Sequence, residues 1–177
     1  MIQDLKVVKT RREPDGIIRL VQATPNQSED IRALLVEAAE WMVGNDLNHW
    51  TPDLFTQDSI RKYFDDRDIY IAYLNESPAG LFTLQGDDPA YWGALNDEAY
   101  GYLHRLTVGR SYRKRGLSSW MINAAEEIVL AAGKKGLRLD CITHSPKLND
   151  FYQGQGFIHL GVTDMGDRKV NLYQRKL

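Results

Sequence analysis

The pattern of apolar residues along this 177-residue sequence predicts a mixed α/β (α+β) fold built on a central sheet. Two observations support that prediction. Helical and extended patterns follow one another in the order β-α-α-β-β-β-α-β-α-β-β, and antiparallel hairpins flank a single strand–helix–strand unit. We therefore expect about six or seven strands in one sheet, flanked by about four helices.

The first third of the chain is predicted to contain one strand and two helices. Residues 1–16 are polar and charged, and we expect them to form a loose arm before a strand at 17–23. Ser28 is a suitable N-cap through its hydroxyl, and the two acidic residues after it favour a helix N-terminus. Apolar residues then recur at helical spacing as far as Met42. A weaker helix is expected at about 56–64.

The rest of the chain has mainly the pattern of strands. A hairpin is predicted over 69–85, where Asn-Glu-Ser-Pro separates two apolar runs. A long loop at 86–97 leads to a strand at 100–108, and the strongest helix pattern covers 116–132 with Gly133 as its stop. The remaining predicted elements are a strand at 136–142, a helix at 147–153 and strands at 157–162 and 170–174.

Composition and charge exclude several classes of protein. Hydrophobic residues make up 43% of the chain and charged residues 26%, which is ordinary for one globular domain, expected at 17–177. The single cysteine, Cys141, fits a reducing cytoplasm and excludes a cysteine-rich zinc cluster, while four scattered histidines argue against a metal site. With no signal peptide, no membrane-length apolar run and a net charge of −2, we expect a cytoplasmic protein without membrane or nucleic-acid partners.

A basic turn before the strongest predicted helix indicates ligand chemistry. A helix N-terminus exposes unpaired N–H groups and a partial positive charge, and Gly116 lets a phosphate approach the backbone closely. The spacing is not that of a nucleoside-triphosphate P-loop. A phosphate cradle and a merely solvated turn are both compatible with this pattern. The residues of the predicted cradle are Arg113, Lys114, Arg115, Gly116, Leu117, Ser118 and Ser119.

The segment 113–118, with the sequence RKRGLS, resembles the Arg/Gln-x-x-Gly-x-Gly/Ala signature of the GNAT superfamily of acetyl-CoA-dependent N-acetyltransferases. Further along, the segment 151–157 resembles the second signature of that family, Phe-Tyr followed by Gly-Phe. The resemblance covers about residues 17–176. It departs from the family at Ser118, where Gly or Ala is preferred, but a small residue still permits close approach to the backbone.

The resemblance implies where acetyl-CoA binds. The strand at 100–108 should splay from the strand at 136–142, so that its freed backbone groups pair with the pantetheine arm of the cofactor. The amides at 114–119 should hold the pyrophosphate. An Asn that often contacts the cofactor in the family is replaced here by Ser145, and Asn149 is a polar neighbour able to substitute in part. The strand residues expected at the cofactor are Leu106, Thr107 and Val108.

The resemblance also implies transfer of an acetyl group to a primary amine by direct attack in a ternary complex, releasing coenzyme A. Tyr152 occupies the general-acid position, with simple packing beside the cofactor as the alternative. A backbone N–H near Val108 would polarise the thioester carbonyl. The base is left open between Asp140, His104, another residue and water.

The resemblance also implies an acceptor pocket near Trp41, Trp50 and Trp92. Trp41 is on an apolar helix face, which favours a core position; Trp50 fits core and pocket equally, and Trp92 is a lid or a packing anchor. We expect the acceptor to be a small-molecule amine, because the chain has no appended peptide-recognition domain.

Three further interpretations are weighed against small-molecule acetylation. Acetylation of a protein N-terminus or lysine is the first, and a non-catalytic acyl-CoA sensor is the second. A nucleic-acid module built on the basic turn is the third, and the net charge disfavours it. The closing strands predict a homodimer by resemblance to the family.

Overall fold

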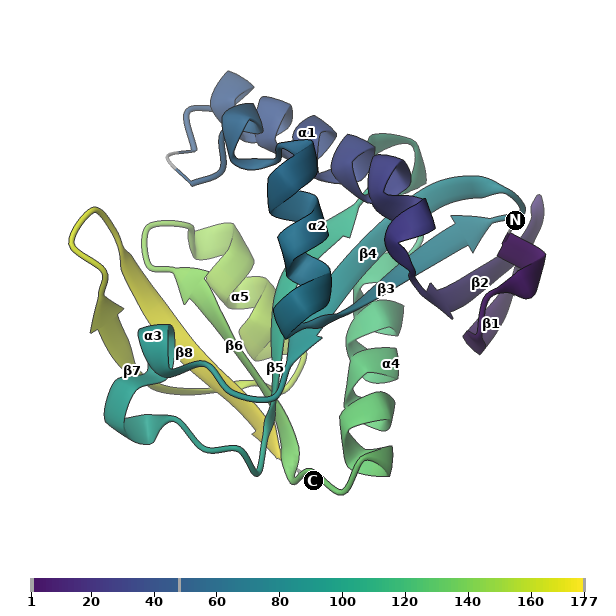
Figure 1. Ribbon diagram of the computed structural model, residues 1–177. Coiled ribbons are helices and arrows are strands. Elements are labelled where there is room, and N and C mark those ends of the chain that lie inside the picture. Colours follow the sequence, from purple (N-terminus) through teal and green to yellow (C-terminus); the bar gives the residue numbers. More distant parts are fainter. Residues whose placement is uncertain (1, 48, 177) are drawn as a thin grey trace. The chain divides into compact units, whose positions relative to one another are not determined.

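The computed structural model describes residues 2–47 and 49–176. Within these residues eight strands lie in the hydrogen-bonded order β1-β2-β3-β4-β5-β6-β8-β7, accompanied by five α-helices (Figure 1). The expected mixed α/β sheet is confirmed, with slightly more elements than the pattern predicted. The strands are β1 Val7–Glu13, β2 Gly16–Gln22, β3 Asp68–Leu74, β4 Ser77–Gln85, β5 Gly101–Val108, β6 Gly136–Ile142, β7 Ile158–Asp164 and β8 Lys169–Lys176. The helices are α1 Ser28–Gly44, α2 Gln57–Asp66, α3 Pro89–Trp92, α4 Leu117–Ala131 and α5 Pro146–Gly154.

The chain divides into two compact units, which are described separately. Unit 1 contains the residues up to Thr83 together with Arg105–Met121. Unit 2 contains Leu84–His104 and the residues from Ile122 onward. Strand β5 and helix α4 therefore each begin in one unit and end in the other.

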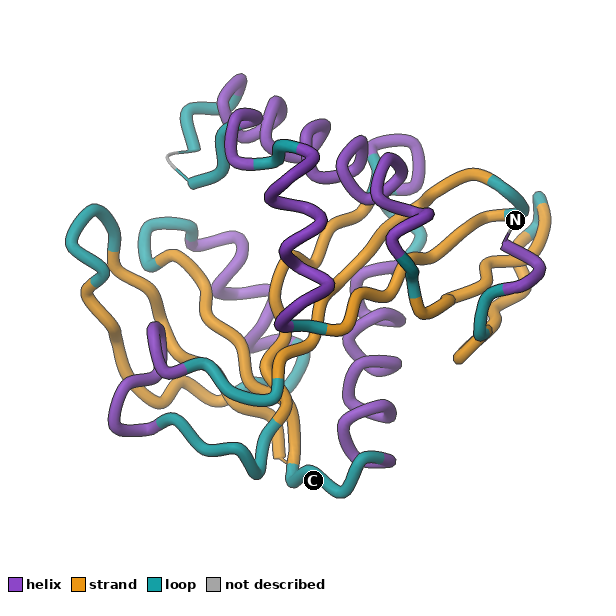
Figure 2. The backbone as a smooth tube through the Cα atoms, viewed as in Figure 1, coloured by secondary structure: helices purple, strands orange, loops and turns teal. Residues whose placement is uncertain are grey.

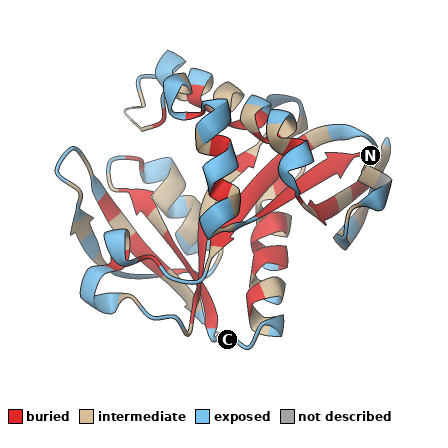
Figure 3. Cartoon of the chain, in the orientation of Figure 1, coloured by how far each residue is buried: buried red, intermediate tan, exposed pale blue. Residues whose placement is uncertain are grey.

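Unit 1 has a core formed by α1 and α2 against strands β2, β3 and β4. Strand β2 pairs antiparallel with β3, with Ile18 opposite Leu74. Nearly all of β3 is buried, as its red colour in Figure 3 shows. Its near-continuous apolar sequence is typical of a strand that is covered on both faces of the sheet. The core residues include Val21, Ile31, Leu34, Leu35, Phe55, Ile60, Ile69, Ile71 and Leu81.

The prediction of a loose arm at residues 1–16 is wrong over Val7–Glu13, because these residues form strand β1. This strand pairs antiparallel with β2, from Val7 opposite Val21 to Glu13 opposite Gly16. As the edge of the sheet, β1 keeps charged side chains exposed or half-buried, so its sequence lacks the apolar alternation that marks a strand.

The start of α1 also differs from the prediction. Ser28 is not the N-cap: it lies in the first turn, and its hydroxyl donates to the carbonyl of Pro25 at 2.6 Å. A short 3-10 turn at Pro25–Gln27 comes first, and the Gln27 side chain accepts from the backbone N–H of Thr24 at 2.8 Å. Proline at the first position of a turn favours this earlier start.

Unit 2 is built on β6, β8 and β7. Strand β6 pairs antiparallel with β8 along its whole length, and β8 pairs antiparallel with β7. The parallel ladder of β5 with β6 joins only Gly101 to Leu137 and Tyr102 to Arg138 in the part described, in agreement with the expected splay. The segment expected as a loop at 86–97 contains α3 and a 3-10 turn, visible in Figure 2.

The described helices are of ordinary length. The longest, α1, has 17 residues. No helix within residues 2–47 and 49–176 combines the length and apolar character needed to cross a bilayer. The cytoplasmic location expected from the sequence stays a prediction.

Candidate active site

The basic turn before α4 has the backbone of an anion-binding loop. Lys114 and Gly116 both have positive φ, at 63° and 69°, a conformation common in loops whose amides converge on an anion. A side chain at Gly116 would meet no atom within 4 Å, so the φ value rather than crowding favours glycine. Arg113 and Lys114 are exposed, and the first amides of α4, from Leu117, have no partner within the helix. These features fit a pyrophosphate.

Two residues from the amino-terminal hairpin support this turn. Arg115 forms a two-bond ion pair with Asp15 at 2.9 and 3.1 Å, and these hydrogen bonds raise the pKa of the guanidinium and lower the pKa of the carboxyl. Arg11 donates to the carbonyl of Arg115 at 3.1 Å and lies over the ring of Trp120 at 5.5 Å. Asp15 therefore offsets part of the positive charge with which Arg115 is expected to attract the cofactor pyrophosphate.

Strand β5 has an irregular backbone where the sequence predicts pairing with the cofactor. Arg105 has a φ of 57°, which is uncommon for a residue other than glycine. Thr107 is buried, and its hydroxyl donates to the carbonyl of Arg105 at 3.0 Å, which stabilises this conformation. Leu106 and Val108 are half-buried. The pairing of these two residues with the cofactor stays a prediction.

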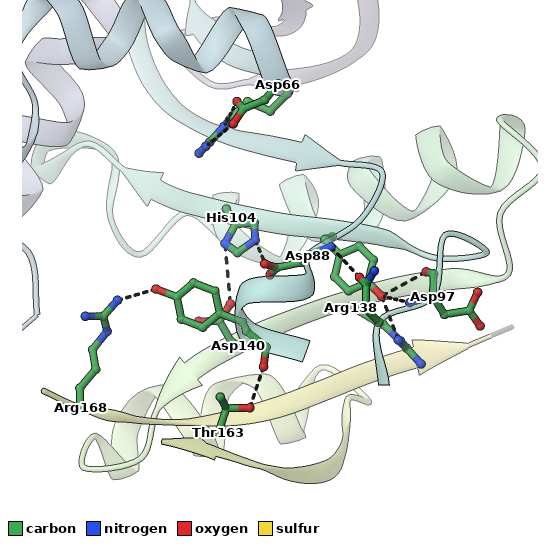
Figure 4. Close-up of polar contacts among 12 residues, drawn as sticks. Asp66, Asp88, Asp97, His104, Arg138, Asp140, Thr163 and Arg168 are labelled. Atoms are coloured by element: carbon green, nitrogen blue, oxygen red, sulfur yellow. Dashed lines mark hydrogen bonds and ion pairs between the residues drawn. The ribbon is translucent and has the colours of Figure 1, made fainter. Parts of the chain in front are cut away.

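A histidine in unit 2 lies between two carboxylates (Figure 4). Its Nε2 is 2.9 Å from Oδ2 of Asp88, and its Nδ1 is 3.7 Å from Oδ1 of Asp140. The exposed fractions of the side chains are 16% for His104, 6% for Asp88 and 12% for Asp140. The structure thus brings together the two protein candidates for the base that the sequence leaves open, and adds a third residue.

The position of Asp88 is fixed by the segment around α3. Its backbone amide donates to Oδ1 of Asn96 at 2.7 Å. Nearby, the carbonyl of Tyr91 accepts from Thr163 at 2.6 Å, and the hydroxyl of Tyr91 accepts from Arg168 (Figure 4). Sequence reasoning misses Asp88, because one acidic residue in a polar segment carries no local signal of its partner.

The same three side chains also have the spacing of a metal site. One ligand atom from each of Asp88, His104 and Asp140 lies within 4.8 Å of the others. The scattering of histidines along the sequence is therefore a poor argument against metal ligation, since folding brings together residues that are distant in sequence.

Tyr152 lies on α5 with its ring packed against other aromatic side chains. The ring centroids of Phe151 and Phe157 are 5.2 and 6.0 Å away, both edge to face. Burial raises the pKa of the Tyr152 phenol, and the neighbouring Cys141 and Asp140 raise it further. The hydroxyl therefore keeps its proton at neutral pH, as a general acid requires.

The two residues considered in place of the family's asparagine have structural partners. Ser145 is the N-cap of α5, and its hydroxyl accepts from the amide of Leu148 at 3.4 Å. The side-chain amide of Asn149 donates to the carbonyls of Ile142 and Ser145, at 3.0 and 2.8 Å. Its carbonyl oxygen accepts from Asn171 and Tyr173. A cofactor contact through the Asn149 side chain would compete with these bonds, and both cofactor roles stay predictions.

Comparison with known proteins identifies the family. The sequence profile described as the acetyltransferase (GNAT) family matches residues 31–157, well over half of the chain. The chain belongs to the GNAT acetyltransferase family. It is accordingly an acyltransferase, and acetyl-CoA is the co-substrate of the family.

Individual relatives agree with this assignment. An uncharacterised N-acetyltransferase of Bacillus subtilis, YesJ, is 30% identical over 161 residues, which cover 88% of each chain. A GNAT acetyltransferase of Listeria monocytogenes has a TM-score of 0.78 at 23% identity, covering 96% of this chain and 100% of that one. The PaiA N-acetyltransferase of Thermoplasma acidophilum, solved with coenzyme A, has a TM-score of 0.69 at 17% identity, covering 90% and 99%. The likeness to the two solved structures shows the fold.

The three tryptophans predicted at the acceptor side of this GNAT enzyme have different surroundings. Trp41 is half-buried and lies under the guanidinium of Arg113 at 4.8 Å, so the core position favoured for it is wrong. Trp92 is 2% exposed and packs edge to face on Tyr102, which makes it a packing anchor and not a lid. Trp50 is 8% exposed and belongs to the hydrophobic core of unit 1, and its role at the acceptor side stays a prediction.

Proposed function

We propose that this GNAT enzyme acetylates the primary amine of a small molecule, by direct attack of the amine in a ternary complex. The observation that carries the proposal is the placement of His104 between Asp88 and Asp140. An alkylamine has a pKa of about 10.4 and arrives protonated at neutral pH, so it must lose a proton before it attacks. The three side chains provide a site for that proton.

In this proposal His104 is the base and Asp88 fixes its tautomer. The 2.9 Å contact is a hydrogen bond in which Nε2–H donates to the carboxylate of Asp88, and the lone pair then lies on Nδ1. Nδ1 takes the proton from the amine, directly or through one water. Asp140, 3.7 Å from Nδ1, stabilises the imidazolium that forms. Asp140 acting as the base through water is the alternative within the same cluster.

The cradle residues fit the role of holding the cofactor. Acetyl-CoA, when bound, supplies an acetyl group activated as a thioester. The backbone at 114–119 would hold the pyrophosphate, with Arg113 adding charge, and the backbone of Leu106 and Val108 would orient the amide-rich arm. Tyr152, kept protonated by burial, would donate its hydroxyl proton to the leaving sulfur.

Two experiments test this function. Calorimetric titration with acetyl-CoA, with dephospho-CoA for comparison, measures the cradle, and release of free thiol with a library of amines measures turnover. We expect micromolar binding and turnover that His104→Gln reduces by about 100-fold or more with binding retained, in keeping with the usual contribution of a general base. Stoichiometric binding without turnover for any amine would favour the non-catalytic sensor. Turnover unchanged in Tyr152→Phe would remove the general-acid role.

We also propose that the enzyme is a homodimer that associates through β7. This strand is the last in the sheet order, and it exposes Ile158, Leu160 and Val162 with 67%, 41% and 54% of their surface accessible. An edge strand with exposed apolar side chains is prone to pairing with another chain. A monomer at micromolar concentration in analytical ultracentrifugation would contradict this assembly.

A further inference from the structure

The guanidinium of Arg105 in unit 1 is enclosed by three aromatic side chains. Its central carbon lies 5.2 Å from the ring centroid of Trp50, 5.5 Å from that of Phe55 and 5.9 Å from that of Tyr63. The Nε–H donates to the hydroxyl of Tyr63 at 3.2 Å. These contacts hold the guanidinium in place while leaving its two terminal nitrogens available as donors. We call this arrangement the Arg105 box, formed by Arg105, Trp50, Phe55 and Tyr63.

The charge in the Arg105 box has no acidic partner among the residues that the structure describes. The contrast with Arg67 is direct, because both guanidinium groups contact the ring of Tyr63. Arg67 lies 4.2 Å from that ring and forms a two-bond ion pair with Asp66, at 2.9 and 3.3 Å. Arg105 is half-buried and forms no ion pair within the described chain. A partly desolvated cation without a counter-charge is a favourable place for an anion to bind.

A second, independent observation also indicates a ligand. The indole N–H of Trp50 is buried, in a side chain only 8% exposed, and it has no acceptor among residues 2–47 and 49–176. Buried donors in proteins are nearly always paired, because leaving one unpaired costs about 1–3 kcal/mol. Arg105 and Trp50, which adjoin one another in the box, therefore both carry donor groups without an acceptor among the described residues.

The backbone at Arg105 is consistent with a functional position. Its φ of 57° is a left-handed conformation, which costs energy for a residue with a side chain. Along the chain, Arg105 directly follows His104, the proposed base, and directly precedes Leu106, where the cofactor arm is expected. Arg105 is thus adjacent in the chain to the proposed base and to the first residue expected at the cofactor arm.

We propose that the Arg105 box binds a carboxylate of the acceptor, so that the substrate is an amine that also carries a carboxylate group. This rests on the proposed function. The planar guanidinium matches a carboxylate through two parallel hydrogen bonds, and the three buried rings lower the local dielectric constant, which strengthens this pairing. Arg67, the other guanidinium that contacts Tyr63, is paired with Asp66, so the box offers one unpaired positive charge among the described residues, which favours a monoanionic carboxylate over a phosphate.

Binding is tested without turnover, by recording ¹H–¹⁵N spectra of arginine Nε–H and tryptophan Nε1–H groups during titration with phenylacetate. Neutral 2-phenylethanol and inorganic phosphate are the comparison probes. We expect saturable shifts of the Arg105 and Trp50 signals with phenylacetate alone. Arg105→Gln should weaken binding at least about tenfold, and Arg105→Lys should restore it only in part, because the fork geometry is lost.

The matched control is Arg67→Gln, which removes the paired guanidinium from the other contact with Tyr63. It should leave phenylacetate binding within about twofold of the unchanged protein, because that charge is already neutralised by Asp66. Equal binding in Arg105→Gln, or shifts with 2-phenylethanol as large as with phenylacetate, would overturn the carboxylate site. Stronger binding of phosphate than of phenylacetate would assign the box to a phosphate.

Turnover provides the second arm. Pairs of ω-amino acids and alkylamines of equal length have nearly the same amine pKa, so only the carboxylate differs. We expect the amino acid of a pair to have a KM at least about tenfold lower, and Arg105→Gln to abolish that difference while kcat changes little. Thiol release without preference for the carboxylate overturns this inference and leaves the proposed function intact. Carboxylate binding without thiol release for any amine would support the carboxylate site and contradict the proposed acetylation.

Discussion

Replacing Asp88 with asparagine tests the proposed proton-transfer cluster, which is formed by Asp88, His104 and Asp140. Asparagine keeps the shape of the side chain but removes the charge that faces Nε2 of His104 at 2.9 Å. At an effective dielectric constant of about 20, an imidazolium and a carboxylate at this distance attract each other by about 6 kcal/mol. Desolvation offsets much of this, and hydrogen bonds to charged groups contribute about 1.5–3 kcal/mol net. The expected fall in kcat is therefore about 10- to 150-fold.

The assay is free-thiol release at saturating concentrations of both substrates. The matched control is Asp87→Asn, the same substitution at the exposed neighbouring position, which should leave kcat unchanged. Acetyl-CoA affinity and the midpoint of thermal unfolding should be the same in both variants. A kcat for Asp88→Asn within threefold of the unchanged enzyme would refute the positioning role. Dialysis against a chelator should have no effect, and a loss of activity restored by zinc would assign the cluster to a metal instead.

Three further predictions follow from other parts of the chain. Arg11→Ala, which removes the hydrogen bond to the carbonyl of Arg115, should weaken acetyl-CoA binding about 2- to 10-fold by calorimetry, and unchanged affinity would contradict the supporting role of β1. Burial raises the pKa of the Cys141 thiol to about 12. The stabilisation that comes from burying the neutral thiol is therefore fully present below pH 9, the ordinary pKa of a thiol, and is lost as the pH rises toward 12. A thiol reagent at pH 8 should label Cys141 only in unfolded chains. Val162→Glu should convert the proposed dimer to a monomer in ultracentrifugation, whereas the same substitution at exposed Val43 should not.

The parts predictable from sequence are those whose signals are local. The cradle is a continuous segment, so its basic residues, Gly116 and the start of α4 are recognisable together. The sequence predicts Gly133 as the stop of the strongest helix pattern, and its φ of 85° after α4 confirms the stop. Cys141 lies in β6 and is 5% exposed, in keeping with the usual burial of a small apolar side chain within a strand.

The parts that escaped prediction depend on contacts between distant residues. His104 and Asp140 are 36 positions apart, and Asp88 lies in a segment without a clear pattern, so only folding shows that they form one cluster. Trp41 has the spacing of a core residue on α1, but Arg113 provides a partner for it outside the core. Helical periodicity indicates which face is apolar and leaves open what covers it.

The support of the cradle by Arg11 and Asp15 bears on how chains of this family are compared. The segment by which the family is recognised covers residues 31–157, and both supporting residues precede it. Two chains with an identical signature can therefore differ in cofactor affinity through residues that no comparison of the signature examines. Transplanting the signature alone into another chain would transfer the ligand-facing amides without the hairpin that restrains them.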